Sequence, residues 1–168
     1  LYQVIVSFPS DVATVNETFS FLCRAASIPG MTVGHVQVPY FGRMTKFAGD
    51  RTFEDWNVRV INDEDFSVRN AFESWQNRLA MLDHGTPALQ NSITVGGHEF
   101  LYVDIEVIQM AKDGQTDLKK YYIKKAWPTM IGPIQLAYDD NDRIEEFDVN
   151  FPYDYFVTDK IDGLKSSA

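Results

Sequence analysis

Residues that could support catalysis or metal binding are few and scattered in this chain of 168 residues. The histidines His35, His84 and His98 lie far apart, and none has metal-ligand spacing to another histidine or to Cys23. The chain has no Gly-x-Ser-x-Gly, no phosphate-binding glycine loop and no His-Glu-x-x-His. The sequence therefore predicts no catalytic residue, no metal site and no cofactor, and we do not expect an enzyme.

One acidic cluster has a composition similar to that of a calcium loop. It is Asp139-Asp140-Asn141-Asp142, which supplies oxygen ligands but lacks the central glycine of such a loop. Glu145 and Glu146 follow too soon to provide the ligand at the twelfth position. We interpret the cluster as a solvated acidic turn.

The overall charge limits the classes of partner. The net charge is −9 and the sequence pI is about 4.7. Such an acidic protein lacks the cations that displace counterions from a phosphate backbone, so we expect no DNA binding of the usual kind. The single Cys23 lies in an apolar run and predicts a buried thiol. No apolar run approaches a membrane span, and the chain opens at Leu1 inside a strand pattern, so we expect residues before it.

Hydrophobic periodicity predicts a mainly β fold with one helix, as a single domain over residues 1–160 and a flexible tail over 161–168. Val68, Phe72, Trp75 and Leu79 recur at helical spacing and predict a helix from about residue 65 to 82, packed on a sheet. The expected strands cover residues 1–8, 18–25, 33–41, 53–61, 99–110, 118–127, 134–138 and 144–156, the first two as a hairpin.

Charge patterning adds two expectations for the strands. The lysines of residues 118–127 are expected opposite Asp104 and Glu106, as cross-strand pairs. Between residues 139 and 154 many acids accompany a single base, Arg143, which predicts an acidic face behind an apolar one. Solubility alone is a sufficient explanation for such a face.

The segment from Gly42 to Trp56 is locally basic and irregular, and it predicts a long loop. Gly49 allows a sharp change of direction, and Arg51 carries a planar fork that suits a carboxylate. Three interpretations stay open: a tight turn with an internal Arg–Asp pair, a solvated hairpin tip, or a loop that contacts a neighbouring subunit.

Two blocks of this sequence have a distinctive pattern. They are Ala48-Gly49-Asp50-Arg51-Thr52-Phe53-Glu54-Asp55-Trp56 with Val58, Val60, Asn62-Asp63-Glu64, Phe72 and Trp75-Gln76, and Trp127-Pro128-Thr129 with Gly132, Gln135-Leu136, Tyr138-Asp139, Asn141, Ile144, Phe147, Val149 and Asp154-Tyr155. In this order they resemble the tail tube protein of contractile-tailed bacteriophages. The resemblance covers most of the chain, apart from residues 82–98.

The resemblance implies a small β-sandwich or incomplete barrel of the phage tail tube type. It implies homohexameric rings in which strands of all subunits join into an inner β-barrel, and rings that stack into a tube. The implied partners are further copies of the chain, the tail sheath protein, and baseplate and tube-terminator proteins. DNA passes through the tube without specific binding, and the protein is assembled in the host cytoplasm into the virion tail, with no membrane anchor.

The resemblance also implies where the contacts lie. The loop from Val38 to Trp56 would reach an adjacent subunit or ring. Its expected contact residues are Arg43, Lys46, Asp50, Arg51 and Trp56. The expected lumen residues are Asp148 and Asp154, or Asp104 and Glu106, as a negative wall past which DNA slides, and residues 82–98 are a candidate sheath contact.

Two other functions stay open at this point. The first is a related tube, either a baseplate tube-initiator or the inner tube of a contractile injection or type VI secretion system. The second belongs to another class, a monomeric β-sandwich binding module or small hydrolase.

Overall fold

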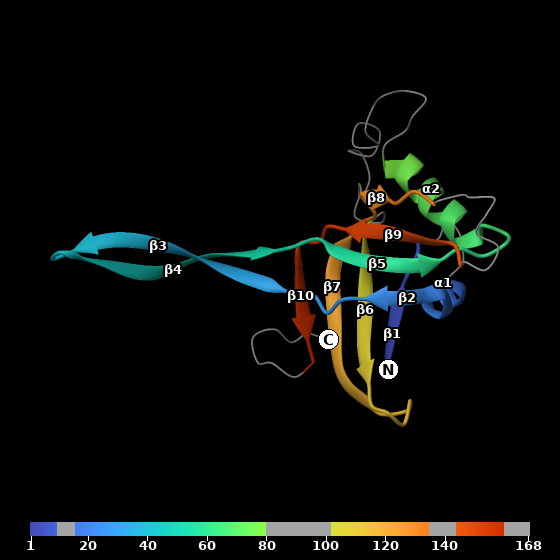
Figure 1. Ribbon diagram of the computed structural model, residues 1–168, viewed down its shortest axis with the longest axis horizontal. Coiled ribbons are helices and arrows are strands. Elements are labelled where there is room, and N and C mark those ends of the chain that lie inside the picture. Colours follow the sequence, from blue (N-terminus) through green and yellow to red (C-terminus); the bar gives the residue numbers. More distant parts are fainter. Residues whose placement is uncertain (10–15, 80–101, 135–143, 160–168) are drawn as a thin grey trace, which may run out of the picture.

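The computed structural model describes residues 1–9, 16–79, 102–134 and 144–159. Two four-stranded antiparallel sheets form the body, and a two-stranded hairpin projects from it (Figure 1). Sheet A has the order β1 (Tyr2–Val6), β6 (Val103–Met110), β7 (Asp117–Ala126), β10 (Tyr155–Thr158). Sheet B has the order β2 (Cys23–Ala26), β5 (Trp56–Ile61), β9 (Glu146–Phe151), β8 (Met130–Ile131). The mainly β prediction is confirmed, and neither sheet closes on itself within one chain.

Alternating strands supply the core between the two sheets. Val4 and Val6 of β1 are fully buried, as are Val58 and Val60 of β5. Their neighbours in sequence point outward, which is the period of two that a half-buried strand requires. Trp56 belongs to this core, because its side chain is 1% exposed and its Nε1 donates a hydrogen bond of 2.6 Å to the Ser27 carbonyl.

The predicted helix is present as α2 (Ser67–Leu79), with Val68, Phe72 and Trp75 buried. Phe72 contacts the rings of Phe8, which follows β1, and of Phe147 on β9, at centroid distances of 5.1 and 6.5 Å. The helix therefore ties both sheets together through one aromatic cluster. It begins two residues later than predicted, where Asp63 Oδ2 accepts hydrogen bonds from the Ser67 amide and hydroxyl.

The prediction of a strand over residues 18–25 is wrong. This segment forms α1 (Asn16–Leu22) followed by β2, and β2 pairs with β5 rather than with β1. Alternation of apolar residues over so short a run fits either structure, and the helix places Phe19 and Leu22, three residues apart, on one side. Phe19 packs edge-on against Phe8 and Phe72, which holds the helix to the core.

The long strand expected over residues 144–156 is also divided. β9 ends at Phe151 in sheet B, and β10 begins at Tyr155 in sheet A, so the chain changes sheets here. Pro152, which cannot donate a ladder hydrogen bond, stands at the break. The alternation shifts across it, so that Phe156 rather than Tyr155 is buried.

Other expected elements lie partly or wholly outside the described residues. These are residues 82–98, most of the strand at 134–138, the acidic turn at 139–142, the start of the strand at 99–110, and the tail at 161–168. The turn of the expected β6–β7 hairpin is present, with Gly114 at a φ of +69°.

The aromatic cluster yields a stability prediction. Phe72→Ala should lower the free energy of unfolding by about 3–5 kcal/mol, because it removes a ring that bridges both sheets. Urea denaturation of dilute protein measures the change. Phe47→Ala is the matched control, since that ring is 56% exposed on the hairpin, and it should cost less than about 1 kcal/mol. Equal losses for the two variants would contradict the bridging role.

Candidate assembly surfaces

A regular hairpin occupies the segment that the sequence predicted as a loop. β3 (Met31–Tyr40) and β4 (Arg43–Phe53) pair antiparallel, from Met31 with Phe53 to Tyr40 with Arg43. The turn is Phe41-Gly42, with φ values of +46° and +77°, the conformation that suits a two-residue hairpin. Every residue of β3 is exposed, and the hairpin extends away from both sheets (Figure 1). The loop prediction is therefore wrong in its geometry.

Gly49 allows β3 and β4 to approach each other closely, and the chain makes no sharp turn there. Between Val33 and His35 the pairing shifts, because β4 has one more residue than β3 in this stretch, which is the pattern of a β-bulge. A Cβ on Gly49 would lie 3.3 Å from the carbonyl carbon of Gly34, tighter than most Cβ contacts. Two glycines therefore face each other where the hairpin shifts register.

Beyond the bulge, the hairpin has an apolar face. Residues paired across an antiparallel ladder share a face, and Val36 pairs with Phe47 while Val38 pairs with Thr45. Tyr40 continues the same face at the end of β3. Val36, Val38, Tyr40 and Phe47 are 57%, 42%, 60% and 56% exposed, and we call them the ribbon face. The opposite face is mixed, with His35, Gln37 and Lys46 among its residues.

The predicted contact residues Arg43, Lys46, Asp50 and Arg51 all lie exposed on β4. None of them forms an ion pair with another described residue, so the interpretation of this segment as a tight turn with an internal Arg–Asp pair is wrong. Arg51 lies eight positions after Arg43, which corresponds to roughly 26 Å of strand. The four residues therefore do not form a single patch. Trp56, the fifth expected contact, is a core residue, and we leave it out of the candidate surface.

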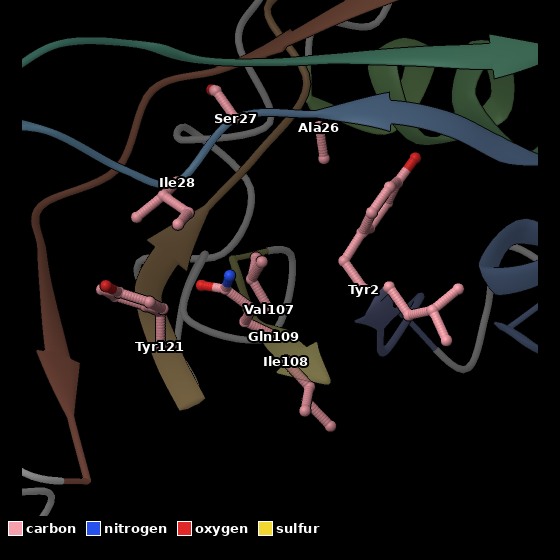
Figure 2. Close-up of a pocket in the computed structure, with 9 residues that line it drawn as sticks. Tyr2, Ala26, Ser27, Ile28, Val107, Ile108, Gln109 and Tyr121 are labelled. Carbon is pink, nitrogen blue, oxygen red and sulfur yellow. The ribbon is translucent and has the colours of Figure 1, made fainter. Parts of the chain in front are cut away.

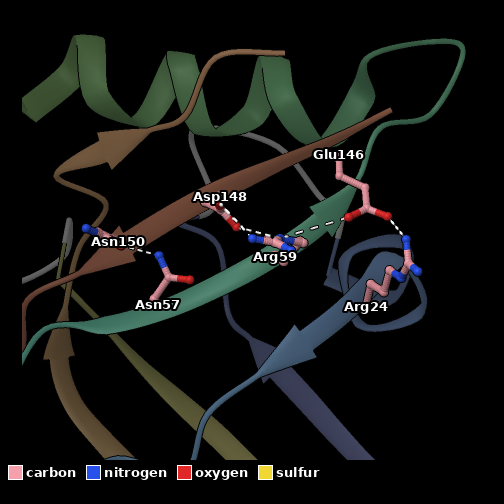
Figure 3. A network of polar contacts seen from close by, with 6 residues as sticks. All are labelled: Arg24, Asn57, Arg59, Glu146, Asp148 and Asn150. Atoms are coloured by element: carbon pink, nitrogen blue, oxygen red, sulfur yellow. Dashed lines mark hydrogen bonds and ion pairs between the residues drawn. The ribbon is translucent and has the colours of Figure 1, made fainter. Parts of the chain in front are cut away.

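The outward face of sheet B carries a polar network (Figure 3). Arg59 Nε donates to Asp148 Oδ1 at 2.9 Å and lies 3.9 Å from Glu146 Oε2. Glu146 also pairs with Arg24, and in the adjoining row Asn57 Nδ2 donates to Asn150 Oδ1 at 2.5 Å. The hydrogen bonds and charge of Asp148 raise the pKa of Arg59, which keeps its guanidinium protonated. We call these six residues the polar ladder.

The acids of sheet A are paired too, as the sequence predicted. Lys124 Nζ lies 2.6 Å from Asp104, and Lys120 Nζ lies 3.7 Å from Glu106. Asp154, in the connection between β9 and β10, lies 3.9 Å from Lys125. All four expected lumen acids thus have a cation within 4 Å. The predicted acidic face is wrong for Glu146 and Asp148, because the fold brings Arg24 and Arg59 beside them from other strands.

The two outward faces differ in character. On sheet A, the row that contains Glu106 also contains Ile5, Tyr122 and Val157, so one charged residue stands among apolar and aromatic ones. On sheet B, the middle of the face is the polar ladder. Because the sheets pack face to face, these faces point in opposite directions. Asp104 and Glu106 therefore cannot line the same channel wall as Asp148.

Comparison with known proteins gives the family. A family profile described as phage tail tube protein matches residues 1–159. The chain belongs to the phage tail tube protein family. It is 35% identical over 150 residues to the tail tube protein gp19 of Enterobacteria phage T4, covering 89% of this chain and 87% of that protein. The tail tube protein of Serratia phage KSP90 is 28% identical over 161 residues, covering 95% of this chain and 86% of that protein. This chain is accordingly a structural protein of the virion tail.

Solved structures of distant sequence share the fold. A chain of the anti-feeding prophage baseplate superposes with a TM-score of 0.62 at 9% identity, covering 94% of this chain and 91% of that chain. A chain from the sheath/tube terminator structure of an extracellular contractile injection system gives a TM-score of 0.58 at 15% identity, covering 94% and 91%. At these identities the likeness concerns the fold alone.

Among residues 1–9, 16–79, 102–134 and 144–159, no group of three or more His, Cys, Asp or Glu side chains is placed to hold a metal ion. No described helix is long and apolar enough to cross a membrane.

Sequence reasoning missed the ribbon face and the polar ladder. The alternation of Val36, Val38 and Tyr40 predicted an extended strand, but without β4 as its partner strand it did not indicate an exposed apolar face. The ladder joins residues more than 80 positions apart, Arg59 and Asp148, and no local pattern marks such a pair.

Proposed function

We propose that this chain is the repeating subunit of a tail tube, in which six copies form a ring head to tail and the rings stack. The ribbon face carries the proposal. The buried core does not include these four side chains, and no described segment covers them. A projecting apolar surface of this kind is characteristic of protein–protein contact. The six-fold symmetry of the anti-feeding prophage baseplate, whose chain has the same fold, supports the ring size.

Ring closure through sheet B fits the strand directions. Its four strands alternate in direction from β2 at one edge to β8 at the other. A rotation about the tube axis keeps these directions, so β8 of one subunit beside β2 of the next is again an antiparallel pair. Closure into a barrel leaves no exposed edge. We assign the lumen to the outward face of sheet B because the polar ladder suits water, whereas the apolar residues of sheet A suit contact with protein.

The polar ladder then defines what passing DNA would meet. Free arginines bind phosphates tightly and retain DNA. Here Glu146 and Asp148 neutralise Arg24 and Arg59, and the asparagines bond to each other. Such a wall offers hydrated polar groups without unpaired positive charge. DNA can therefore slide past it without specific binding, and no catalytic step is required of the protein.

The remaining partners follow from the same assembly. The outer wall of the tube would contact the tail sheath, with residues 82–98 as the candidate contact, and the ends would meet baseplate and terminator proteins. The hairpin would reach an adjacent subunit or ring, with Arg43, Lys46, Asp50 and Arg51 as its polar contacts. Assembly takes place in the host cytoplasm, with no membrane anchor.

A second candidate is the inner tube of a contractile injection system. The structural likeness to chains of such systems favours it. The phage assignment has stronger support, because the phage relatives reach 35% identity over most of the chain whereas those injection-system chains stay at 15% or below. A monomeric binding module accounts for neither the ribbon face nor the family.

Electron microscopy of the purified protein across a concentration series tests the assembly. The wild-type chain should form rings with a central hole, or stacked tubes, if necessary on an added baseplate. Arg51→Glu should fold normally, because Arg51 has no ion pair among the described residues, but should not form tubes. Glu64→Lys, a charge reversal at an exposed site outside the hairpin, is the matched control and should assemble. Tubes of normal length from Arg51→Glu would contradict the hairpin contact, and a wild-type monomer under all conditions would contradict the ring.

Asp148→Asn tests the assignment of the lumen. The change removes the carboxylate that neutralises Arg59, so assembled tubes should retain duplex DNA at low salt and release it as salt rises. We expect at least about a tenfold gain in retention at 50 mM salt, since one phosphate contact to a charged group is of that size. Asp104→Asn is the matched control on sheet A, where it frees Lys124. Retention by Asp104→Asn alone would place sheet A in the lumen instead.

A further inference from the structure

The tip of the hairpin carries a residue that its backbone conformation disfavours. Phe41 has a φ of +46°, in the left-handed region that bulky side chains rarely adopt. Asparagine or glycine is the usual choice at this position of a two-residue turn. The Phe41 side chain is 90% exposed, and its only described ring contact is with Tyr40, edge-on at 4.6 Å. Nothing within the described chain explains an aromatic residue here, and strained residues of this kind concentrate at functional sites.

A pocket opens on the body of the protein, between β2 and the strands β6 and β7 (Figure 2). Its volume is about 250 Å³. Apolar side chains make up most of its lining, with Gln109 as a polar group: the principal residues are Leu1, Tyr2, Ile28, Val107 and Tyr121. The inward-facing Val107 and Tyr121 connect it to the core, so the pocket is a surface recess at the edge of the packing between the two sheets.

The size of the pocket suits one aromatic side chain. A cavity of about 150 Å³ lined by apolar residues is enough to bind benzene. The pocket here is larger than that, and smaller than the sites that bind drug-sized ligands, which begin at about 300 Å³. The pocket volume therefore suits a single phenyl ring better than a drug-sized ligand.

The charges near the tip of the hairpin and at the rim of the pocket are opposite in sign. Arg43 and Lys46 follow the tip, and neither has an ion pair in the described chain. The β6–β7 turn borders the pocket, since a Cβ on Gly114 would lie 3.6 Å from Leu1 Cδ1. Asp113 in this turn accepts hydrogen bonds from Thr116 and Gln115, which lower its pKa and keep it ionised. No lysine or arginine of the described residues pairs with it.

We propose that the pocket lined by Tyr2, Ile28 and Tyr121 receives Phe41 from the hairpin of a second copy of this chain, with Asp113 facing Arg43. The occupant comes from another copy because the hairpin points its tip away from its own body (Figure 1). This inference rests on the self-assembly proposed above and names the surface that the hairpin contacts.

Cross-linking between two different variants tests the contact. Phe41→Cys and Gln109→Cys chains are mixed under assembly conditions and treated with a short thiol-specific cross-linker. The mixture should give a linked dimer at several times the yield of either variant alone. The native Cys23 should stay silent, because it is buried and burial raises its pKa to about 12. Ser74→Cys on α2, mixed with Phe41→Cys, is the control for random collision.

The outcomes separate this inference from the proposed function. Rings or tubes by electron microscopy without a link between positions 41 and 109 would overturn the pocket while the tube stands. Linkage of Phe41→Cys chains to one another would likewise overturn it, in favour of contact between tips. Absence of both assembly and linkage would overturn both proposals.

Substitution at the tip gives an independent test. Phe41→Asn creates Asn-Gly, the preferred pair for this turn, so the hairpin and the thermal stability of the monomer should be kept or improved. The concentration needed for assembly should rise about tenfold or more, because the apolar burial is lost. Phe41→Tyr keeps the ring and should assemble nearly as the wild type does. Unchanged assembly of Phe41→Asn would show that the aromatic ring has no partner.

Discussion

The apolar side chains of the ribbon face stay exposed in the single chain, because the core of the body forms without them. The two sheets and α2 bury their apolar side chains against one another, so the four side chains of the ribbon face have no remaining surface of their own chain to cover them. Covering each such half-exposed side chain in a partner contributes on the order of 1 kcal/mol. The free energy of burying these side chains is therefore available only in contacts between copies. This requirement connects the fold to the assembly of a tube.

Contacts with the core also fix the direction of the β3–β4 hairpin. Phe53, the last residue of β4, packs against Tyr153 and Phe156 at centroid distances of 5.8 and 5.7 Å. Trp56 follows it into the core and bonds to Ser27, in the connection that leads to β3. Both strands of the hairpin are thus anchored where they leave the body. An anchored ribbon loses less conformational entropy on docking than a loop of the same length would.

The local sequence pattern predicted the structure correctly where residues that are close in the sequence also pack together. The alternation through Trp56 and Val58, the helical stripe of Val68, Phe72 and Trp75, and the pairing of Lys124 with Asp104 across one hairpin all follow from short-range periodicity. The pattern failed at β4, because Phe41-Gly42 is not a turn that composition identifies, and without the turn the basic residues after it looked like a loop. It failed for the polar ladder because the partners of Glu146 and Asp148 come from β2 and β5, which only the sheet order brings together.

In the proposed tube, the features of the free subunit that lack a partner favour growth at an existing end. The strained turn at Phe41, the open pocket and the unpaired edges of sheet B are all present in the single chain, and in the proposed tube contacts with neighbouring copies offset their cost. A subunit that meets one partner relieves some of them, whereas one that joins the end of a ring stack can relieve all of them at once. Binding at a formed end is therefore favoured over pairing in solution. On the proposed assembly, growth at an existing end is therefore expected to dominate over random association of free subunits.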